Sequence, residues 1–463
     1  MGGKACMIIK KVEIYSTHEA YKRPIPIAVG IHDSRDNVLV KITADNGLVG
    51  WGEGSPLLPS YSGEVRDQMV DDIVKRIAPD ILGQKITTVD DILALIQHIR
   101  RNKYYFQCAI AAVDIALFDL LGKQKKKPVF ELIRNYLKLN EHKKLPELPA
   151  NFTVSRNATK TDDKIDEMIK EANYYVSQGY SVIKIKIGIF KNSDERAVKK
   201  LSQYMKKNYP KRVINLFVDG NQAYSTVQEI LAIINKIRPY ISGLEQPFHR
   251  NIPFLSALLY KKLKSMKDAP FLITDEGSSS IEEMENVMMS DAAAGSLLKL
   301  VRSGGFSFLI WLSNLLRKYP QFKLEPMSMT ETGIGTTANL HSALVIYEHC
   351  NLMSGFGFDG PMQVIGDSYK TGNDTIIYKN KRTGWLIKNK KGVAIYDLKQ
   401  IIGNGKGLGI DINQKYINKI INNKTIIYLK NSSVVKEEIN FKNNKKIKEI
   451  IGKQKRILKH PRY

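Results

Sequence analysis

From about residue 151 onward, short apolar segments alternate with longer segments whose apolar residues recur at helical spacing. Strands that alternate with helices predict parallel strands joined by crossover helices, and eight such units close into a (β/α) barrel. A doubly wound dinucleotide-binding sheet is the competing arrangement, but no apolar segment here is followed by a GxGxxG turn. The barrel is therefore the predicted fold. The eight segments are NFTVS, SVIKIKIG, INLFVDG, GLEQP, FLITDEG, GSLLKLV, FKLEPMS and SGFGFDGP.

The chain of 463 residues exceeds what a single ordinary core holds, so more than one domain is expected. Residues 1–140 contain strand-like segments followed by segments with helical spacing, which predicts an α+β domain. We expect the barrel to occupy 145–365 and a short C-terminal segment to span 366–410. Residues 411–463 are expected to form a basic extension rich in Lys, Asn and Ile, without a recognisable motif.

The net charge of the chain is +25, and basic residues crowd together in the C-terminal extension. Clustered Lys and Arg side chains bind polyanions by releasing counterions, so a nucleic acid or an anionic membrane would be the partner of such a segment. The alternative is a Lys-biased composition whose charges are spread over solvated surfaces. We favour this alternative, because no aromatic stacking platform and no base-reading motif accompany the charge.

Two further features predict a cytoplasmic protein. No apolar run reaches the roughly 18 residues of a membrane span, and no signal-peptide core follows the first residues. Cys6, Cys108 and Cys350 lie far apart and lack CxxC spacing, so they suggest neither a disulfide framework nor a zinc site.

The second apolar segment carries two lysines, Lys184 and Lys186, each between isoleucines. Side chains alternate between the two faces of a strand, so both lysines share one face and the isoleucines share the other. In a barrel the isoleucines would pack against the helices and the lysines would point inward. A surface strand would show the same pattern, so this motif alone leaves both interpretations open.

The next three strands each end in an acid, namely Asp219, Glu245 and Asp275, spaced about one strand–helix unit apart. Each acid therefore falls at the carboxyl end of its strand, where barrel active sites are built. Three converging carboxylates would repel one another unless a cation lay between them. Oxygen ligands suit Mg²⁺, with Mn²⁺ as the alternative, so the acids predict a divalent metal site.

The following strand contributes Lys299, which keeps the same spacing. If NFTVS is the first strand, Lys186 lies on the second strand and Lys299 on the sixth, and these two strands are diametrically opposed in an eight-stranded barrel. A substrate on the metal would then have one lysine on each face. A lysine that extends out of the strand end to solvent is the alternative for Lys299.

This arrangement permits proton transfer next to a carboxylate. The hydrogen on such a carbon is very weakly acidic, so its removal requires electrostatic stabilisation of a doubly negative enediolate by a metal and nearby cations. A lysine acts as the base when burial and neighbouring cations lower its pKa. One lysine that removes the proton and an opposite lysine that returns it would invert the stereocentre.

The sequence resembles the enolase superfamily, and within it the muconate-lactonizing enzyme subgroup, over about residues 8–410. The matching motifs are KIKIG at 184–188, the three acids, and Lys299. The resemblance implies a modified (β/α)7β TIM barrel with an N-terminal α+β capping domain, on which residues 366–410 pack back. It also implies a Mg²⁺ site with a lysine base and a homo-oligomer.

The resemblance implies roles for individual residues. Lys186 matches the base of the family motif, and Lys184 matches the residue that assists electrostatically and contacts the substrate carboxylate. Asn221 and Glu276 match residues that support the metal acids.

Within the subgroup, the chain is most similar to dipeptide epimerases. NFTVS resembles their first-strand motif, from which Thr153 would reach the substrate, and MSMTET at 327–332 resembles their seventh-strand motif. The latter implies substrate contacts from Ser328 and Met329 and a supporting role for Glu331. Asp359 would hold the α-ammonium of the substrate. Where those enzymes usually have a second acid, however, this chain has Gly357.

The resemblance thus implies an Mg²⁺-dependent epimerase or racemase of a small carboxylate substrate, in particular a dipeptide or another amino-acid derivative. A muconate-type cycloisomerase, an o-succinylbenzoate synthase and an N-acylamino acid racemase are alternatives that would use the same site. A scaffold protein whose basic extension binds nucleic acid or an anionic membrane is the alternative from another class. In the family, the cap loops set specificity, and here they fall near 22–35 and 56–63.

Overall fold

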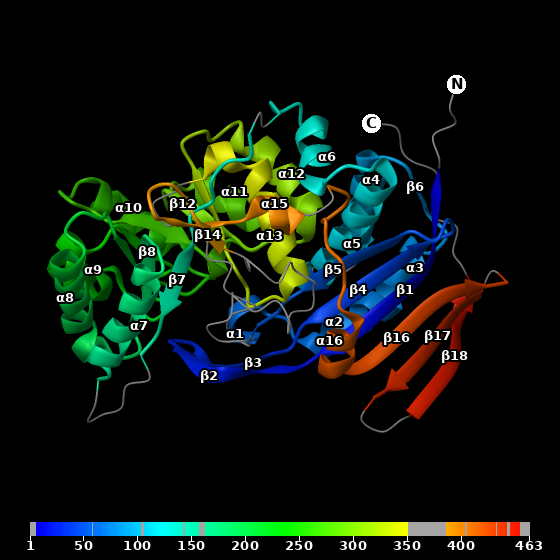
Figure 1. The fold of residues 1–463 in the computed structure, drawn as a ribbon, viewed down its shortest axis with the longest axis horizontal. Helices are drawn as coiled ribbons and strands as arrows, with labels where there is room; N and C mark the ends of the chain where they lie inside the picture. Colours follow the sequence, from blue (N-terminus) through cyan, green and yellow to red (C-terminus); the bar gives the residue numbers. More distant parts are fainter. Residues whose placement is uncertain are drawn as a thin grey trace.

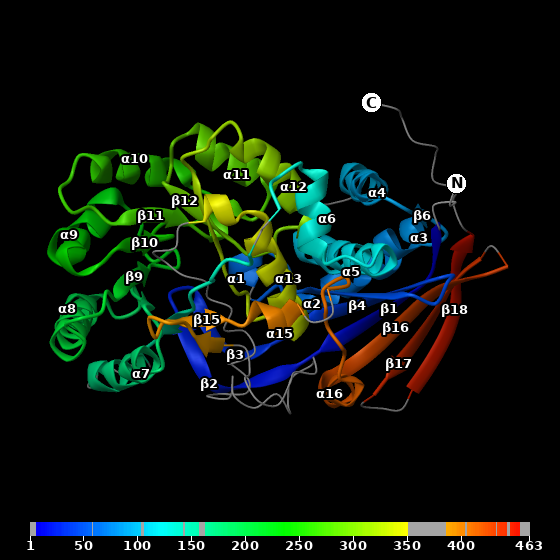
Figure 2. The ribbon, with the colours of Figure 1, turned by 45° about the horizontal axis from the view of Figure 1, so that its top comes forward.

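The computed structural model describes residues 6–57, 59–102, 106–141, 144–156, 163–350, 386–402, 405–431, 433–441 and 445–453. A parallel sheet wrapped by helices lies beside an antiparallel sheet that carries its own helices (Figures 1 and 2). Within these residues, no helix combines the length and the apolar character that crossing a membrane requires.

The first sheet is the predicted barrel. Seven parallel strands follow one another in the order of the sequence, and a helix follows each strand. The strands are β7 (Asn151–Val154), β8 (Val182–Lys186), β9 (Asn215–Asp219), β10 (Gly243–Glu245), β11 (Phe271–Thr274), β12 (Gly295–Leu298) and β13 (Lys323–Pro326). The helices are α7 (Ile165–Ser177), α8 (Lys191–Asn208), α9 (Val227–Ile237), α10 (Pro253–Lys264), α11 (Ile281–Met289), α12 (Gly305–Leu316) and α13 (Gly333–Val345).

The eighth predicted segment, SGFGFDGP, lies outside the described residues. Just before it, Cys350 forms a parallel bridge with Leu324 of β13, so the chain returns to the edge of the sheet at that point. The β-strand and helix alternation, together with the fold similarities given below, confirms the modified TIM barrel with an N-terminal cap.

Side chains inside the barrel form two layers. An apolar cluster of Val182, Phe217, Ile273, Leu297 and Met327 fills the interior. The polar layer lies two residues further along the first four of these strands, because alternate side chains share a face. Its members are Lys184, Asp219, Asp275 and Lys299.

The cap is built around an antiparallel sheet on which α5 packs. Its strands are β1 (Met7–Thr17), β4 (Val38–Ala44), β5 (Val49–Gly54) and β6 (Lys85–Ile86), and β4 lies between β1 and β5. A Cβ on Gly52 of β5 would lie 2.1 Å from the carbonyl oxygen of Ala112, so only glycine lets the helix approach this closely. The helices are α1 (Pro59–Ser62), α2 (Arg66–Asp72), the π-helical turn η1 (Ile73–Ile77), α3 (Ala78–Ile81), α4 (Val89–Asn102), α5 (Gln107–Lys125) and α6 (Val129–Tyr136).

A hairpin leaves the cap sheet and reaches the barrel (Figure 1). It consists of β2 (Glu19–Ile27) paired antiparallel with β3 (Gly30–Arg35), and it is called the cap hairpin below. It includes residues 22–35, where one of the two cap loops is expected from the sequence.

The C-terminal part of the chain contacts both domains. β14 (Leu386–Lys388) pairs with β15 (Ala394–Tyr396), and the amide of Ala150, just before β7, donates to the carbonyl oxygen of Ala394. After α15 (Leu398–Ile402), the amide of Leu408 donates to Asp119 of cap helix α5 at 2.8 Å.

The C-terminal extension, 411–463, contains α16 (Gln414–Ile420), β16 (Ile421–Lys430), β17 (Ser433–Asn440) and β18 (Lys445–Lys453). β16 pairs antiparallel with β1 from Lys11 to Thr17, so the extension enlarges the cap sheet in the order β18-β17-β16-β1-β4-β5. Figure 2 shows these three strands continuing the blue strands of the cap. This pairing joins residues that are about 400 positions apart in the sequence.

Candidate active site

The predicted lysines and acids lie side by side at the carboxyl ends of adjacent strands. Lys186, Asp219 and Glu245 are in register across β8, β9 and β10. Lys186 Nζ lies 2.5 Å from Asp219 Oδ2, and Lys184 Nζ lies 2.8 Å from Glu245 Oε2. All of these side chains are buried except that of Lys186, which is 14% exposed. The structure thus brings the predicted strand-end residues together as one polar cluster.

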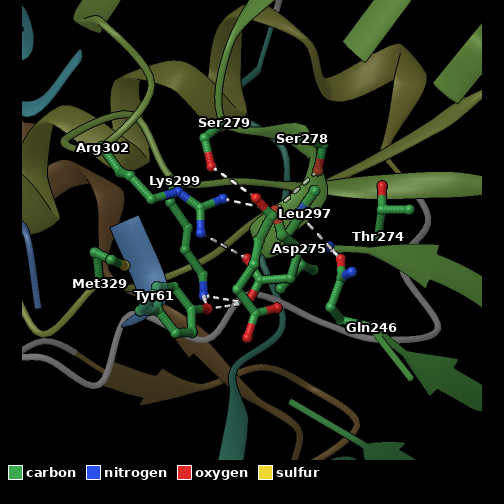
Figure 3. Close-up of polar contacts among 12 residues, drawn as sticks. Tyr61, Gln246, Thr274, Asp275, Ser278, Ser279, Leu297, Lys299, Arg302 and Met329 are labelled. Atoms are coloured by element: carbon green, nitrogen blue, oxygen red, sulfur yellow. Dashed lines mark hydrogen bonds and ion pairs between the residues drawn. The ribbon is translucent and has the colours of Figure 1, made fainter. Parts of the chain in front are cut away.

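Asp275 lies at the end of β11 and contacts a lysine in the same way. Lys299 Nζ lies 2.7 Å from Asp275 Oδ2. The hydroxyl of Tyr61, on cap helix α1, donates to the same carboxylate oxygen, and Lys299 donates to that hydroxyl. Figure 3 shows Lys299 and Tyr61 converging on Asp275. The cap therefore supplies part of this cluster.

Arg302 completes the surroundings of Asp275. Its Nη1 lies 3.1 Å from Asp275 Oδ1, and its Nη2 donates to the Asp275 carbonyl oxygen at 2.9 Å. The side chain is only 1% exposed, so its charge acts at low dielectric. Burial raises the pKa of Asp275, but Lys299 and Arg302 outweigh burial and hold it well below its usual range.

The lysines differ in their electrostatic surroundings. Burial alone would lower the pKa of Lys184, but the charges of Glu245 and Asp219 raise it, so Lys184 keeps its proton. Burial lowers the pKa of Lys299, and the positive charges of Arg302 and Lys184 lower it as well. The negative charge of Asp275 raises the pKa, but the net shift is downward. A lowered pKa is the condition under which a lysine can accept a proton.

The three acids have the donor chemistry of a site for a hard divalent cation. They are fully buried, all their donors are oxygen, and Glu245 Oε1 has no hydrogen-bond partner among the described residues. In the described part of the chain, no group of three or more His, Cys, Asp or Glu side chains is already arranged to hold a metal ion. Each of the three acids contacts a lysine ammonium. Burial and the negative charges of Asp219 and Asp275 raise the pKa of Glu245. A cation bound between the three carboxylates would relieve the repulsion among them.

A group of hydrogen bonds holds the acids at these strand ends. The amide of Asn221 donates to Asp219 Oδ1 at 2.8 Å, and Asn221 Nδ2 donates to Glu276 Oε1 at 3.2 Å. Asn221 adopts a positive φ of 37°, which turns the chain back toward the carboxylate. The amide of Asp275 donates to Gln246 Oε1 at 2.7 Å. Asn221 and Glu276 thus lie beside the acids that they are predicted to support.

The predicted substrate contacts line a pocket above this cluster. Thr153 is in register with Lys184 on the neighbouring strand, and Ser328 and Met329 follow β13. Glu331 accepts from the amide of Met329 at 2.5 Å and from the hydroxyl of Ser328 at 3.0 Å, so it fixes this turn. The pocket is lined by Pro24, Ile25, Ile27, His32, Leu57, Tyr61, Phe152, Thr153, Ser155, Lys184, Lys186, Lys299, Met327, Ser328, Met329 and Thr330. Asp359 and Gly357 lie outside the described residues.

Three further residues of the site, Tyr61, Arg302 and His32, carry no sequence motif that marks them as functional. His32 of the cap hairpin is 5% exposed, and its Nε2 has no hydrogen-bond partner among the described residues. Burial and the nearby charges of Lys186 and Lys299 lower the pKa of His32 to about 4, so the ring is neutral at pH 7. Tyr61 and His32 fall within the two expected cap loops, and this position is the only feature of the sequence that could have indicated their role. Arg302 follows Lys299 by three residues but has no motif of its own.

The barrel, its polar layer and the cap that contributes to the pocket define an enzyme of the enolase superfamily. Two family models match the chain: the N-terminal domain of mandelate racemase / muconate lactonizing enzyme over residues 11–134, and the enolase C-terminal domain-like family over 167–380. Together they match more than half of the sequence. The chain belongs to the mandelate racemase and muconate lactonizing enzyme family, which confirms the resemblance.

The relatives of the chain include epimerases and racemases. It is 27% identical to L-Ala-D/L-Glu epimerase of Bacillus subtilis (strain 168) over 369 residues, which cover 79% of this chain and 92% of the relative. It is 24% identical to N-succinyl-L-Arg/Lys racemase of Bacillus cereus over 338 residues, which cover 73% and 84%. The structure of a dipeptide epimerase from Cytophaga hutchinsonii matches the fold with a TM-score of 0.72 at 22% identity, covering 91% of this chain and 100% of the other. Family and relatives together identify the chain as an isomerase.

Proposed function

We propose that this enzyme is an Mg²⁺-dependent epimerase that inverts the carbon next to the carboxylate of a dipeptide. The observation that carries the proposal is the position of Lys186 and Lys299. They come from β8 and β12, four strands apart in the sheet, and both line the same pocket. A substrate between them would present one face to each amine, as a two-base inversion requires.

The two lysines would exchange roles according to the configuration of the substrate. A neutral lysine removes the α-proton on its side, and the protonated lysine opposite delivers a proton to the other face. The contacts of Lys299 with Asp275 and Tyr61 fix the position of its amine. Lys184, whose charge is maintained by Glu245, would attract the substrate carboxylate and the negative charge that develops on proton removal.

Asp219, Glu245 and Asp275 are the residues that would hold the cation. When bound, Mg²⁺ supplies positive charge that stabilises the dianion formed by proton removal. Asn221 and Gln246 keep the carboxylates at the strand ends through their contacts with Asp219 and Asp275.

The rest of the pocket supports a substrate with an apolar side chain. Ile25, Ile27, Leu57 and Phe152 line it, and burial of apolar substrate surface against such residues favours binding. The neutral ring of His32 offers its unpaired Nε2 for one hydrogen bond in the same pocket. The similarity to a dipeptide epimerase over 79% of the chain supports a dipeptide as the first class to test.

The test is exchange of the α-hydrogen with solvent. A library of L,L-dipeptides with apolar and charged second residues is incubated with the enzyme and Mg²⁺ in deuterated water, and mass spectrometry and NMR report deuterium and the new diastereomer. We expect both for apolar dipeptides and neither after EDTA treatment, with recovery on adding Mg²⁺ back. A parallel set of N-acylated amino acids tests the racemase alternative. Exchange in that set alone, or in neither set, would contradict the dipeptide assignment.

A further inference from the structure

We propose that the C-terminal extension holds the cap hairpin in place over the pocket, through a buried chain of hydrogen bonds that starts at Tyr416. The role in substrate binding rests on the function proposed above. Glu19, Arg35 and Glu331 lie within the ranges that the family models match, whereas Tyr416 lies beyond residue 380, where the second model ends.

The hydrogen-bond chain runs from the extension to the barrel. The hydroxyl of Tyr416 on α16 donates to Glu19 Oε1. Glu19 Oε2 accepts from Arg35 Nε at 2.7 Å and lies 2.6 Å from Arg35 Nη2. Arg35 Nη1 then donates to the carbonyl oxygen of Glu331 at 2.8 Å. Glu331 in turn fixes the pocket-lining turn at Met329.

Glu19 and Arg35 are the two ends of the cap hairpin. Glu19 is the first residue of β2 and Arg35 is the last residue of β3, and they are paired across the hairpin. Because Tyr416 contacts Glu19, the extension is attached at the base of the hairpin. A second attachment lies next to it, where the amide of His18 donates to the carbonyl oxygen of Ile420 at 3.0 Å.

The far part of the same hairpin forms one wall of the pocket. Ile25, Ile27 and His32 line the pocket together with Lys186 and Lys299. A small rotation at the base would displace this wall relative to the lysines, since the base is the part of the hairpin that is anchored to the extension and to the barrel turn. Tyr416, Glu19 and Arg35 are therefore positioning residues.

Burial makes these contacts effective. Tyr416 is 7% exposed, Glu19 6% and Arg35 3%. A hydrogen bond to a charged group is stronger in such surroundings than at a surface. A buried group that loses its partner also destabilises the fold by its uncompensated desolvation free energy. Burial alone would lower the pKa of Arg35. The negative charges of Glu19 and Glu53 outweigh burial and raise the pKa above its usual value, so Arg35 stays charged.

The test compares Tyr416→Phe with Tyr428→Phe in the full chain. The hydroxyl of Tyr428 donates to Glu437 within the extension, so this matched control removes a hydroxyl that does not contact the hairpin. Hydrogen–deuterium exchange with mass spectrometry follows peptides from residues 19–35. We expect exchange there to be about tenfold faster in Tyr416→Phe, as loss of a hydrogen bond to a charged group would cause. Tyr428→Phe should leave these peptides unchanged.

Kinetics with the best substrate of the exchange assay provide the second readout. We expect Tyr416→Phe to raise KM roughly fivefold while kcat stays within about twofold, the pattern for lost binding rather than lost chemistry. Unchanged exchange in 19–35, or faster exchange throughout the cap sheet, would overturn the proposed anchoring. Faster local exchange with unchanged KM would overturn the link to binding. The exchange measurement needs no substrate, so it stands or fails independently of the dipeptide assignment.

Discussion

At the scale of single residues, three lysines of one chemical type have three different environments. Lys184 is buried against Glu245, Lys186 is partly exposed beside Asp219, and Lys299 is buried between Asp275, Tyr61 and Arg302. Burial and neighbouring charge act on the same side chain with opposite signs, and their balance decides which amine can lose its proton. The pKa of Lys184 is thereby raised, so it keeps its proton, whereas the pKa of Lys299 is lowered, so it loses its proton more readily.

The two-base proposal makes a prediction for single lysine substitutions. Lys186→Met and Lys299→Met should each reduce epimerisation by about 10²–10⁴-fold, the range typical of a lost general acid or base. Each variant should still exchange the α-hydrogen of one configuration of the substrate, because the remaining lysine reaches only one face. Mass spectrometry of deuterium incorporation from each diastereomer measures this.

The control for that experiment is Lys199→Met, which changes a lysine whose only described ion pair is with Glu195 on the same helix. It should retain the activity of the unchanged enzyme. If either site variant continued to exchange both diastereomers, the assignment of one lysine to each face would be wrong.

At the scale of elements, His341 joins three segments that lie far apart in the sequence. The ring belongs to barrel helix α13, accepts from the amide of Phe130 in cap helix α6 at 3.2 Å, and contacts the carbonyl oxygen of Leu408 at 3.1 Å. The carbonyl requires a donor, so Nε2 carries the single proton of a neutral ring. Complete burial lowers the pKa of His341 to about 4.

Because the His341 ring is buried in its neutral form, we expect the folded protein to lose stability in mild acid. The unfolded chain binds a proton at the ordinary histidine pKa of 6.5, whereas the folded chain resists it down to about 4. Between these values the unfolded state binds more protons, so the contribution is complete above pH 6.5 and is lost as the pH falls toward 4. The loss should reach roughly 3 kcal/mol, since each pKa unit corresponds to about 1.4 kcal/mol.

Urea unfolding at pH 7.5, 6.0 and 4.5 measures this dependence. The free energy of unfolding should fall less steeply with acid in His341→Gln than in the unchanged protein. His98→Gln, a substitution of a side chain that is 40% exposed, should retain the full dependence. Parallel curves for the unchanged protein and His341→Gln would contradict the prediction.

At the scale of the whole molecule, four lysines in the described part of the extension form ion pairs with carboxylates. Lys436 pairs with Glu438 and Glu449, and Lys446 and Lys448 both pair with Glu437. Lys424 reaches across to Glu13 of β1 at 2.6 Å. Lysines that neutralise nearby carboxylates in a sheet release fewer counterions from a polyanion than free lysines would.

We therefore expect the enzyme to bind duplex DNA only non-specifically. Fluorescence anisotropy with a labelled 20-base-pair duplex should give a Kd of about 10 μM or weaker at 150 mM salt. Sub-micromolar binding that persists at this salt concentration would support the scaffold alternative instead.

The barrel strands, the three acids and the lysine pair could be predicted from the sequence because each depends on local order. Alternation along a strand assigns faces, and the strand–helix period places each acid at a carboxyl end. The prediction of Asp219, Glu245 and Lys299 required no knowledge of distant segments. Other residues could not be predicted in this way, because their roles arise from contacts between the cap and the barrel or between neighbouring turns. These residues are Tyr61, His32 and Arg302.

The sequence by itself thus determined the barrel and the polar residues on its inner face, because periodicity is a property of neighbouring residues. Only the tertiary structure decided that β16 pairs with β1 and that Tyr416 contacts Glu19. The physical reason is that such pairings bring together segments separated by nearly the whole chain. Their stability depends on burial and on matched partners in three dimensions, for which no local pattern in the sequence is required.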